Sequence, residues 1–269
     1  MISAALHDTS AFQGPFPFLL PNLKLKQEQE KPKTMGQQDN NLVVTWQPKV
    51  AKTIREQLKI HEEETKGFPF NVPLMVSLVG IPGSGKSTAC NILNDLLEDV
   101  GCMVMPFDGY HYPLDDLKQF PNADDYIYRR GAPDTFDAAR LKRDLARIRH
   151  TDEPTVSLPG FCHSRGDPDH DAFAYNRKHN KVVLCEGLYL LHDDHGFERT
   201  KEFFDLSIYV HADVDDCVER LKVRNQCLPG LTAEEVEVRC EEVDRVNAMT
   251  VEQSKRNADI VAEAMPLCV

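Results

Sequence analysis

The pattern of apolar and polar positions divides the chain into an irregular start and a long periodic part. Residues 1–47 are rich in Pro, Gln and Lys and have no sustained periodicity, which predicts a flexible N-terminal tail. Residues 48–66 place Val50 and Ile54 on one face among charged residues, the spacing of an amphipathic helix. We therefore expect one folded domain over residues 48–269.

From residue 74 onward, apolar runs of strand length alternate with helical patterns. The five predicted strands are Leu74–Val79, Cys102–Pro106, Val182–Cys185, Leu206–Val210 and Asp259–Ala262. Helices are predicted over roughly residues 86–99, 137–149, 213–223 and 232–256. Buried strands that alternate with helices are typical of a parallel sheet covered on both faces. The fold class expected is therefore α/β, with three layers around a five-stranded parallel sheet.

The first predicted strand runs directly into a glycine-rich loop. Residues Gly80–Ser87 read G-I-P-G-S-G-K-S and match the phosphate-loop pattern G-x-x-x-x-G-K-[ST]. The glycines permit backbone N–H groups to wrap around a phosphate, and the N-terminus of the following helix adds partial positive charge. Because the strand before the motif and the helix after it are both present, the pattern predicts a nucleotide-binding P-loop.

Individual residues of this loop have expected roles. Lys86 would reach the β- and γ-phosphates, and the hydroxyl of Ser87 would ligate Mg²⁺. The residues expected to bind the nucleotide are Gly80, Ile81, Pro82, Gly83, Ser84, Gly85, Lys86, Ser87 and Thr88. A GTPase would usually carry an N-K-x-D motif, whereas the Asn-Lys pair of this sequence, Asn180-Lys181, is followed by two valines. We therefore expect ATP rather than GTP.

Two predicted strands lead into an acidic residue that is followed by a glycine. Asp108 comes after the strand Cys102–Pro106, and Glu186 comes after the strand Val182–Cys185. Ligands of open parallel sheets bind at the carboxyl ends of the strands, so both acids should face the phosphate loop. One acid can accept the proton of a substrate hydroxyl while the other helps to hold Mg²⁺.

Composition and charge narrow the classes of partner and location. The formal net charge of −12 disfavours nucleic acids and anionic membranes as partners, and the longest apolar runs are far shorter than a membrane-spanning helix. The eight cysteines are scattered without C-x-x-C spacing, which favours a reducing compartment, and no secretory signal pattern is visible. We expect a cytoplasmic protein, with a mitochondrial location and a homodimer left open.

Four segments together resemble a known enzyme family. They are Gly80–Ser87, Asp108–His111 (D-G-Y-H), Arg129–Asp137 (R-R-G-A-P-D-T-F-D) and Val182–Tyr189 (V-V-L-C-E-G-L-Y). In this order, over about residues 48–269, the sequence resembles the phosphoribulokinase/uridine kinase family of P-loop kinases, including its pantothenate kinase branch and an uncharacterised uridine-kinase-like branch. The resemblance implies an ATP- and Mg²⁺-dependent kinase that phosphorylates a hydroxyl of a small metabolite, with a nucleoside, a pantothenate-like molecule or a sugar as acceptor.

The resemblance also implies roles for single residues. Asp108 corresponds to the family's general base or Mg²⁺-linked aspartate, and Glu186 to its Walker B-like glutamate at the metal. Arg220 and Arg224 correspond to arginines of a helical lid, over about residues 220–240, that close over the transferring phosphate. The alternative for both arginines is an exposed helix face with ion pairs one turn apart.

Candidate acceptor contacts come from three short segments. The stretch Pro159–Asp167 is similar to the family's substrate loop, although Cys162 stands where uridine kinases of the family usually carry Asp. The guanidinium groups of Arg129 and Arg130 suit an anionic group of the acceptor, because their fork of donors matches a carboxylate or a phosphate. The expected acceptor contacts are Tyr110, His111, Arg129, Arg130, His163 and Arg165. The departure at Cys162 keeps an alternative function open, a nucleotide-binding regulatory ATPase without a small-molecule acceptor.

Overall fold

The computed structural model describes residues 46–162, 164–226 and 230–264. Almost all of the predicted tail, residues 1–47, lies outside these ranges, and so does the candidate acceptor contact His163. Among the helices that are described, none combines the length and the apolar character needed to cross a membrane.

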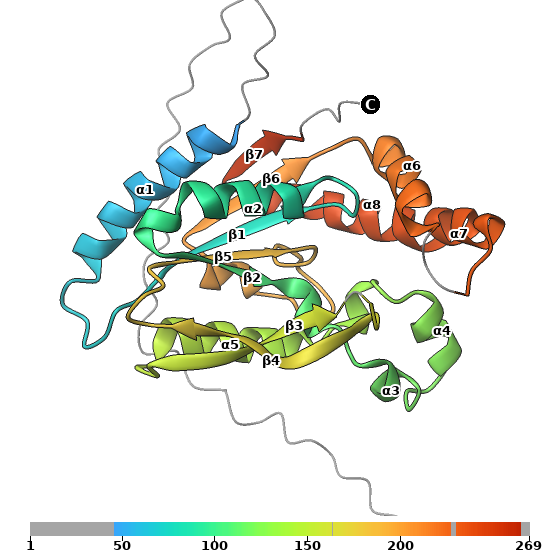
Figure 1. Cartoon of the computed structure of the whole chain (residues 1–269), viewed down its shortest axis with the longest axis horizontal. Coiled ribbons are helices and arrows are strands. Elements are labelled where there is room, and N and C mark those ends of the chain that lie inside the picture. The colour runs from blue at the N-terminus through green and yellow to red at the C-terminus, as the bar shows by residue number, and fades with distance from the viewer. Residues whose placement is uncertain (1–45, 163, 227–229, 265–269) are drawn as a thin grey trace, which may run out of the picture.

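A parallel sheet lies at the centre of the fold (Figure 1). Within the described residues its strands are, in spatial order, β2 (Cys102–Pro106), β5 (Val182–Gly187), β1 (Leu74–Gly80), β6 (Leu206–His211) and β7 (Ile260–Glu263). All seven residues of β1 are buried, and Leu78 lies beside Glu186 of β5 and Ile208 of β6. The five predicted strands are therefore confirmed, each to within two residues at its ends.

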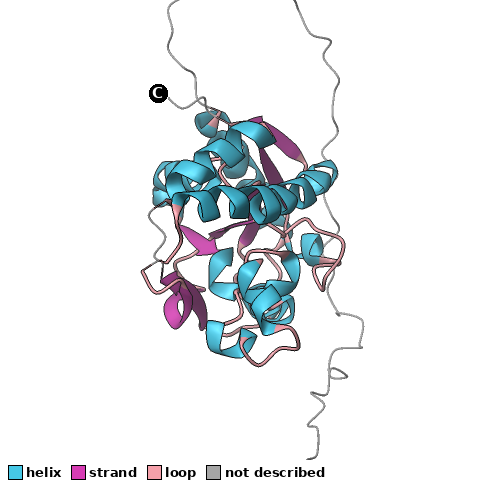
Figure 2. Cartoon of the chain, turned by 90° about the vertical axis from the view of Figure 1, so that its right-hand side faces the viewer, coloured by secondary structure: helices cyan, strands magenta, loops and turns pink. Residues whose placement is uncertain are grey.

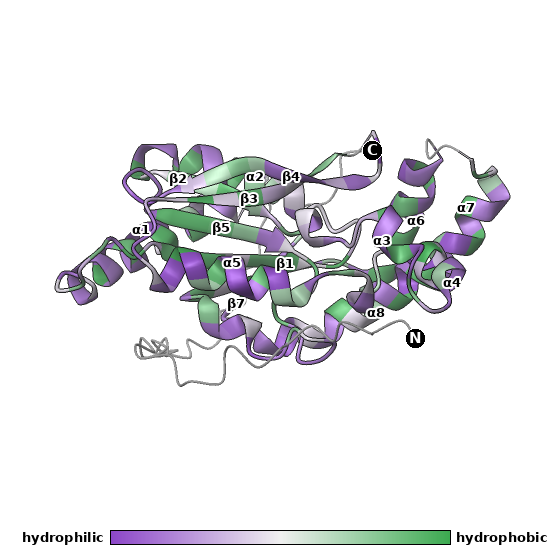
Figure 3. Cartoon of the chain, turned by 90° about the horizontal axis from the view of Figure 1, so that it is seen from below, coloured by the Kyte–Doolittle hydropathy of each residue, from purple (hydrophilic) through white to green (hydrophobic). Residues whose placement is uncertain are grey.

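Helices cover both faces of this sheet (Figures 1 and 2). They are α1 (Gln47–Glu64) and α2 (Lys86–Leu96) on one face, and α5 (Ala138–His150) and α8 (Arg245–Gln253) on the other. Consecutive strand residues point to opposite faces, so Val76 packs with α1 and α2 while Met75 packs with α5 and α8. Figure 3 shows β1 and β5 as predominantly hydrophobic strands, as burial on both faces requires. The three-layer α/β fold is confirmed.

The helix predicted over residues 232–256 is divided into four parts in the structure. α7 (Ala233–Arg239), a π-helical turn (Cys240–Asp244), α8 and a 3₁₀ turn (Ser254–Asn257) follow one another without a break. Thr232 begins α7 with a capping box: its hydroxyl accepts from the N–H of Glu235, whose carboxylate accepts from the N–H of Thr232. Within the predicted lid, residues 220–240, the structure describes the second half of α6 (Val214–Asn225) and the whole of α7.

An antiparallel hairpin lies beside the sheet where the sequence predicted a loop. β3 (Thr155–Cys162) pairs with β4 (Asp167–Asn176), so the expected substrate loop Pro159–Asp167 is reduced to the turn between two strands. A proline and a glycine inside β3 hide the alternating pattern of a strand. The register shift between Leu158 and Gly160 accommodates them in the ladder.

Residues 107–137, which we call the β2–α5 segment, carry most of the candidate acceptor contacts. The segment contains two short helices that the sequence did not predict, α3 (Leu114–Leu117) and α4 (Ala123–Tyr128). The rings of Phe107 and Phe136 stack with 4.4 Å between their centroids, which brings the two ends of the segment together over the core.

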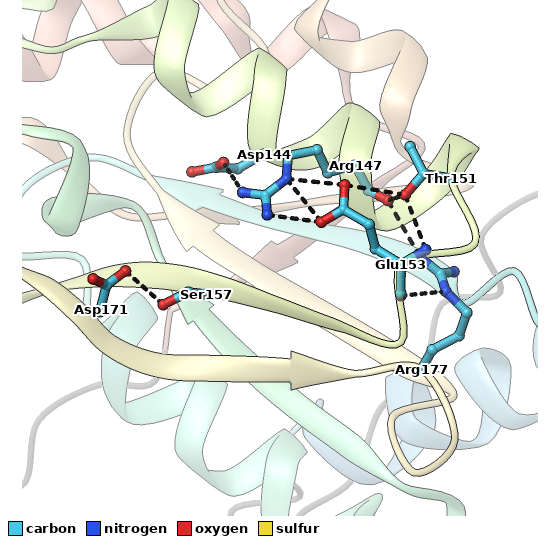
Figure 4. A network of polar contacts seen from close by, with 7 residues as sticks. All are labelled: Asp144, Arg147, Thr151, Glu153, Ser157, Asp171 and Arg177. Carbon is cyan, nitrogen blue, oxygen red and sulfur yellow. Dashed lines mark hydrogen bonds and ion pairs between the residues drawn. The ribbon is translucent and has the colours of Figure 1, made fainter.

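Polar contacts join the hairpin to α5 (Figure 4), and one further contact joins α5 to the β2–α5 segment. On α5, Arg147 donates hydrogen bonds to the carboxylates of Glu153 at 2.8 Å and Asp144 at 3.3 Å. Arg177 at the end of the hairpin donates to the backbone carbonyl of Glu153 at 2.9 Å. The hydroxyl of Tyr110 donates to the second oxygen of Asp144 at 3.1 Å. The network therefore fixes the turn that follows β2 against α5 and the hairpin.

Candidate active site

The phosphate loop connects β1 to α2 at the carboxyl end of the sheet. Gly83 and Gly85 have φ values of +81° and +80°, a left-handed conformation that strains any residue with a Cβ. A Cβ on Gly83 would also lie only 2.8 Å from the backbone oxygen of Cys217 on α6. The shape of the loop thus depends on glycine, and the loop packs closely against α6.

The first turn of α2 offers backbone donors to a ligand. No side chain caps α2 at Gly85, and the amide of Ala89 donates to the Gly85 carbonyl at 3.0 Å. The first N–H groups of a helix have no partner within the helix, and the helix dipole makes this end positive. The loop and the helix together therefore suit the oxygens of a bound phosphate.

Three side chains meet at the end of β1 and β5. The hydroxyl of Ser87 donates to Oε1 of Glu186 at 3.3 Å, and Nζ of Lys86 lies 3.8 Å from the same oxygen. The side chains of Lys86 and Glu186 are each 14% exposed. Burial raises the pKa of Glu186, the charge of Lys86 lowers it in part, and the charge of Asp108 raises it further. The surroundings of Glu186 therefore disfavour its ionised form, and a bound cation would favour that form.

This donor set fits a Mg²⁺ ion that accompanies a nucleotide. A hydroxyl and a carboxylate are the hard oxygen ligands that Mg²⁺ prefers, and the ion usually keeps several waters and takes phosphate oxygens as further ligands. In the described ranges, no group of three or more His, Cys, Asp and Glu residues could hold a metal ion by itself. A nucleotide-bound Mg²⁺ does not need such a cluster, so Ser87 and Glu186 would be enough on the protein side.

Asp108 lies beside this group on the neighbouring strand end. It sits half-buried in a 3₁₀ turn, Phe107–Tyr110, directly after β2. β2 pairs with β5, with Pro106 opposite Glu186, so the two acids follow from adjacent strands at the same edge of the sheet. The backbone oxygen of Asp108 accepts from the amide of His111 at 3.2 Å, which fixes the turn. The two acids that the sequence selected are thus brought together near the phosphate loop.

The two candidate lid arginines take different positions. Nη1 of Arg220 donates to the backbone oxygen of Gly83 at 3.3 Å, so this guanidinium lies at the phosphate loop. Arg224, one turn further along α6, is exposed and its Nε donates to the side chain of Asn225 at 3.2 Å. The structure therefore joins Arg220 to the nucleotide loop and places Arg224 on the outer part of the lid.

Of the expected acceptor contacts, Tyr110 lies in the core, away from a position where it could touch an acceptor. Tyr110 is 1% exposed and its hydroxyl is bonded to Asp144 in the core. His111 is half-buried, with its ring 3.9 Å from that of Phe136 and 5.1 Å from that of Phe161, centroid to centroid. Burial lowers the pKa of His111, which favours its neutral form. Of Tyr110 and His111, His111 is the residue that is partly exposed.

The three arginines expected at the acceptor each form an ion pair with an aspartate of this chain. Arg129 donates to Asp134 and, at 2.6 Å, to Asp125. Arg130 donates to Asp167 at 2.8 Å and to the backbone oxygen of Tyr112 at 2.9 Å, which ties the hairpin turn to the β2–α5 segment. The exposed Arg165 pairs with Asp169. These pairings give all three arginines a structural role, which the sequence spacing did not reveal.

Sequence reasoning also missed a contact between the lid and the β2–α5 segment. Nη2 of Arg239, at the end of α7, donates to the backbone oxygen of Arg130 at 3.0 Å. The hydroxyl of Tyr189 donates to the backbone oxygen of Gly131 at 2.7 Å. Asn247 on α8 is buried beside the same glycine. No local motif marks these residues, because the contacts join positions that are far apart in the chain.

Comparison with known proteins agrees with this geometry. The family model described as phosphoribulokinase / uridine kinase family matches residues 75–268. A protein of Schizosaccharomyces pombe named "Putative uridine kinase C227.14" is 32% identical over 201 residues, which cover 72% of this chain and 84% of that protein. A pantothenate kinase of Pasteurella multocida is 36% identical over 153 residues, covering 55% of this chain and 46% of that enzyme.

The fold is similar to that of solved kinases. The crystal structure of a "putative fructose transport system kinase" from Silicibacter sp. TM1040 matches with a TM-score of 0.68 at 28% identity, over 80% of this chain and 98% of the other. The family match covers the phosphate loop, both acids, the β2–α5 segment and the lid helices in one stretch. The chain belongs to the phosphoribulokinase/uridine kinase family of P-loop kinases.

Proposed function

We propose that this protein is an ATP-dependent kinase that transfers the γ-phosphate of ATP to a hydroxyl group of a small metabolite. The observation that supports it most is the group formed by Lys86, Ser87 and Glu186 at the phosphate loop, with Asp108 at the adjacent strand end. The folded unit would comprise residues 48–269, with residues 220–240 as its lid. Names of relatives point to a nucleoside or a pantothenate-like molecule as acceptor, and a sugar stays in the same class.

The proposed roles follow from charge and position. Lys86 and the N–H groups of the loop would bind the phosphate oxygens, and Arg220 would hold the loop from the side of α6. Ser87 and Glu186 would hold Mg²⁺, which supplies positive charge at the β- and γ-phosphates. Asp108 would accept the proton of the acceptor hydroxyl. The hydroxyl oxygen would form a bond to the γ-phosphorus while the bond between the γ-phosphorus and ADP breaks.

The acceptor would bind over the β2–α5 segment. His111 offers a neutral ring nitrogen near Asp108, because burial lowers its pKa. Arg129, Arg130 and Arg165 would reach an acceptor only by exchanging some of their present contacts, and Arg224 would have to do the same to reach the transferring phosphate. His163, also a candidate, lies outside the described residues.

Purified protein tests this proposal directly. ADP formation from MgATP would be followed with and without members of an acceptor panel: nucleosides, pantothenate, sugars and hydroxy acids. We expect one class to raise ADP formation at least tenfold, with a phosphorylated product seen by mass spectrometry. Hydrolysis that no acceptor stimulates would instead favour the regulatory ATPase.

A further inference from the structure

A chain of polar contacts connects the lid to the β2–α5 segment. Nε of Arg224 donates to Oδ1 of Asn225 at 3.2 Å, and Nδ2 of Asn225 donates to Oδ2 of Asp244 at 3.2 Å. Nη1 of Arg239 lies 3.5 Å from the same oxygen of Asp244. The second terminal nitrogen of Arg239 donates to the backbone oxygen of Arg130 at 3.0 Å. One guanidinium therefore contacts both the lid network and the segment that carries the candidate acceptor contacts.

The π-helical turn allows this arrangement. Arg239 is the last residue of α7 and Asp244 the last of the turn, five positions later. In a regular α-helix, residues five apart are separated by about 140° around the axis and cannot share one partner face. In a π turn the backbone amide donates to the carbonyl five residues earlier, as the amide of Arg245 does to the carbonyl of Cys240, so the two side chains return to one face. Turns of this kind occur frequently at functional sites.

The bridge is shielded from solvent. The side chain of Arg239 is 20% exposed and that of Asp244 is 13% exposed, while Asn225 is buried. Hydrogen bonds that involve charged groups are stronger in such surroundings than on an open surface. By contrast, the contact of Tyr128 with Glu242, which joins the same two parts of the fold at 2.6 Å, lies at an exposed position. Arg239 is therefore the better candidate for coupling a movement of the lid to the β2–α5 segment.

We propose that Arg239 is a positioning residue that couples the lid arginine Arg224 to the β2–α5 segment, an inference that rests on the proposed function. When the lid moves toward a bound nucleotide, Asn225 and Asp244 move with it. Arg239, which contacts Asp244, then moves the backbone at Arg130. Nucleotide binding on one side and acceptor binding on the other then favour the same arrangement. Because such coupling is reciprocal, each ligand raises the affinity for the other by the same factor.

Hydrogen exchange tests the coupling without any acceptor. The probe is the non-hydrolysable analogue AMP-PNP with Mg²⁺, and the readout is amide exchange in residues 123–137. In the wild-type protein we expect the analogue to slow this exchange by about fivefold, the lower end of typical coupling factors. Arg239→Gln should remove the slowing while the dissociation constant for the analogue changes less than about threefold. Arg239→Lys keeps the charge but lacks the fork, and it should restore only part of the effect.

The matched control is Arg245→Gln at the start of α8, directly after the π-helical turn. Arg245 pairs with Glu241 and with Asp215 of α6, residues that lie outside the β2–α5 segment. We expect this variant to keep the slowing of exchange. Equal loss of the effect in Arg239→Gln and Arg245→Gln would overturn the coupling, since any weakening of the helix would then suffice. Wild-type protein that binds the analogue without slower exchange also overturns it but leaves the kinase function standing, whereas failure to bind the analogue overturns both.

Discussion

Replacing Gly83 by alanine tests whether the phosphate loop and α6 are held together by backbone packing. The φ of +81° at Gly83 costs a residue with a Cβ about 1–2 kcal/mol. The new Cβ would stand 2.8 Å from the backbone oxygen of Cys217 and 3.3 Å from Cγ of Leu221, so α6 must move. Such overpacking costs a further 1–3 kcal/mol or so, and we expect Gly83→Ala to lower the free energy of unfolding by about 2–5 kcal/mol.

The matched control is Gly166→Ala on the hairpin turn. There φ is +66° and no atom of the described residues lies within 4 Å of the new Cβ, so only the strain of about 1–2 kcal/mol applies. Urea unfolding followed by circular dichroism gives both free energies, and titration with a fluorescent ATP analogue gives the affinities. Because α6 carries Arg220 to the loop, the affinity should fall about tenfold in Gly83→Ala and change little in the control. Equal stability losses in the two variants would refute the packing argument.

Three further changes test the acids and the core around the site. Asp108→Asn should lower kcat by roughly 10²–10⁴-fold in steady-state assays while the affinity for ATP is kept, and wild-type turnover would remove its role as base. Glu186→Gln should abolish Mg²⁺-dependent activity yet raise the free energy of unfolding at pH 7 by about 0.5–2 kcal/mol, measured by urea unfolding, because an ionised buried carboxyl is removed. Since the pKa of Glu186 is raised above its ordinary value of 4.5, wild-type stability should decline as the pH rises through that raised pKa, and the variant should lack this decline. Tyr110→Phe should cost about 1–3 kcal/mol in thermal unfolding because Asp144 loses a buried donor, and an unchanged melting temperature would contradict this role.

Local signals were sufficient for the sheet and the nucleotide half of the site. β1 and β5 read as apolar runs because both of their faces are covered, so no alternation was needed to find them. The glycine pattern of the phosphate loop reflects a backbone shape that few other residues tolerate. Asp108 and Glu186 could be selected because parallel strands bring their carboxyl ends to one edge, whatever the rest of the fold does.

The parts that depend on distant partners could not be predicted in the same way. Arg130 was expected at an anionic acceptor group because a guanidinium fork suits a carboxylate or a phosphate, but in the structure Asp167 of the hairpin pairs with it. That pairing requires β3 and β4, whose pattern is interrupted by Pro159 and Gly160. Likewise, residues 232–256 read as one regular helix, and nothing in their spacing marks the π turn or the contact of Arg239 with the β2–α5 segment.

The electrostatics of the two acids connect stability with ligand binding. Glu186 is buried near Asp108, and both burial and this neighbouring negative charge raise its pKa, so its ionised form costs free energy in the protein alone. Lys86, 3.8 Å away, offsets part of that cost. A cation that enters with the nucleotide phosphates would offset more, since it favours the ionised carboxyl that binds it. Strain of this kind at a binding site lowers the stability of the free protein and is recovered when the ligand binds, so MgATP should stabilise the fold more than ATP with EDTA does.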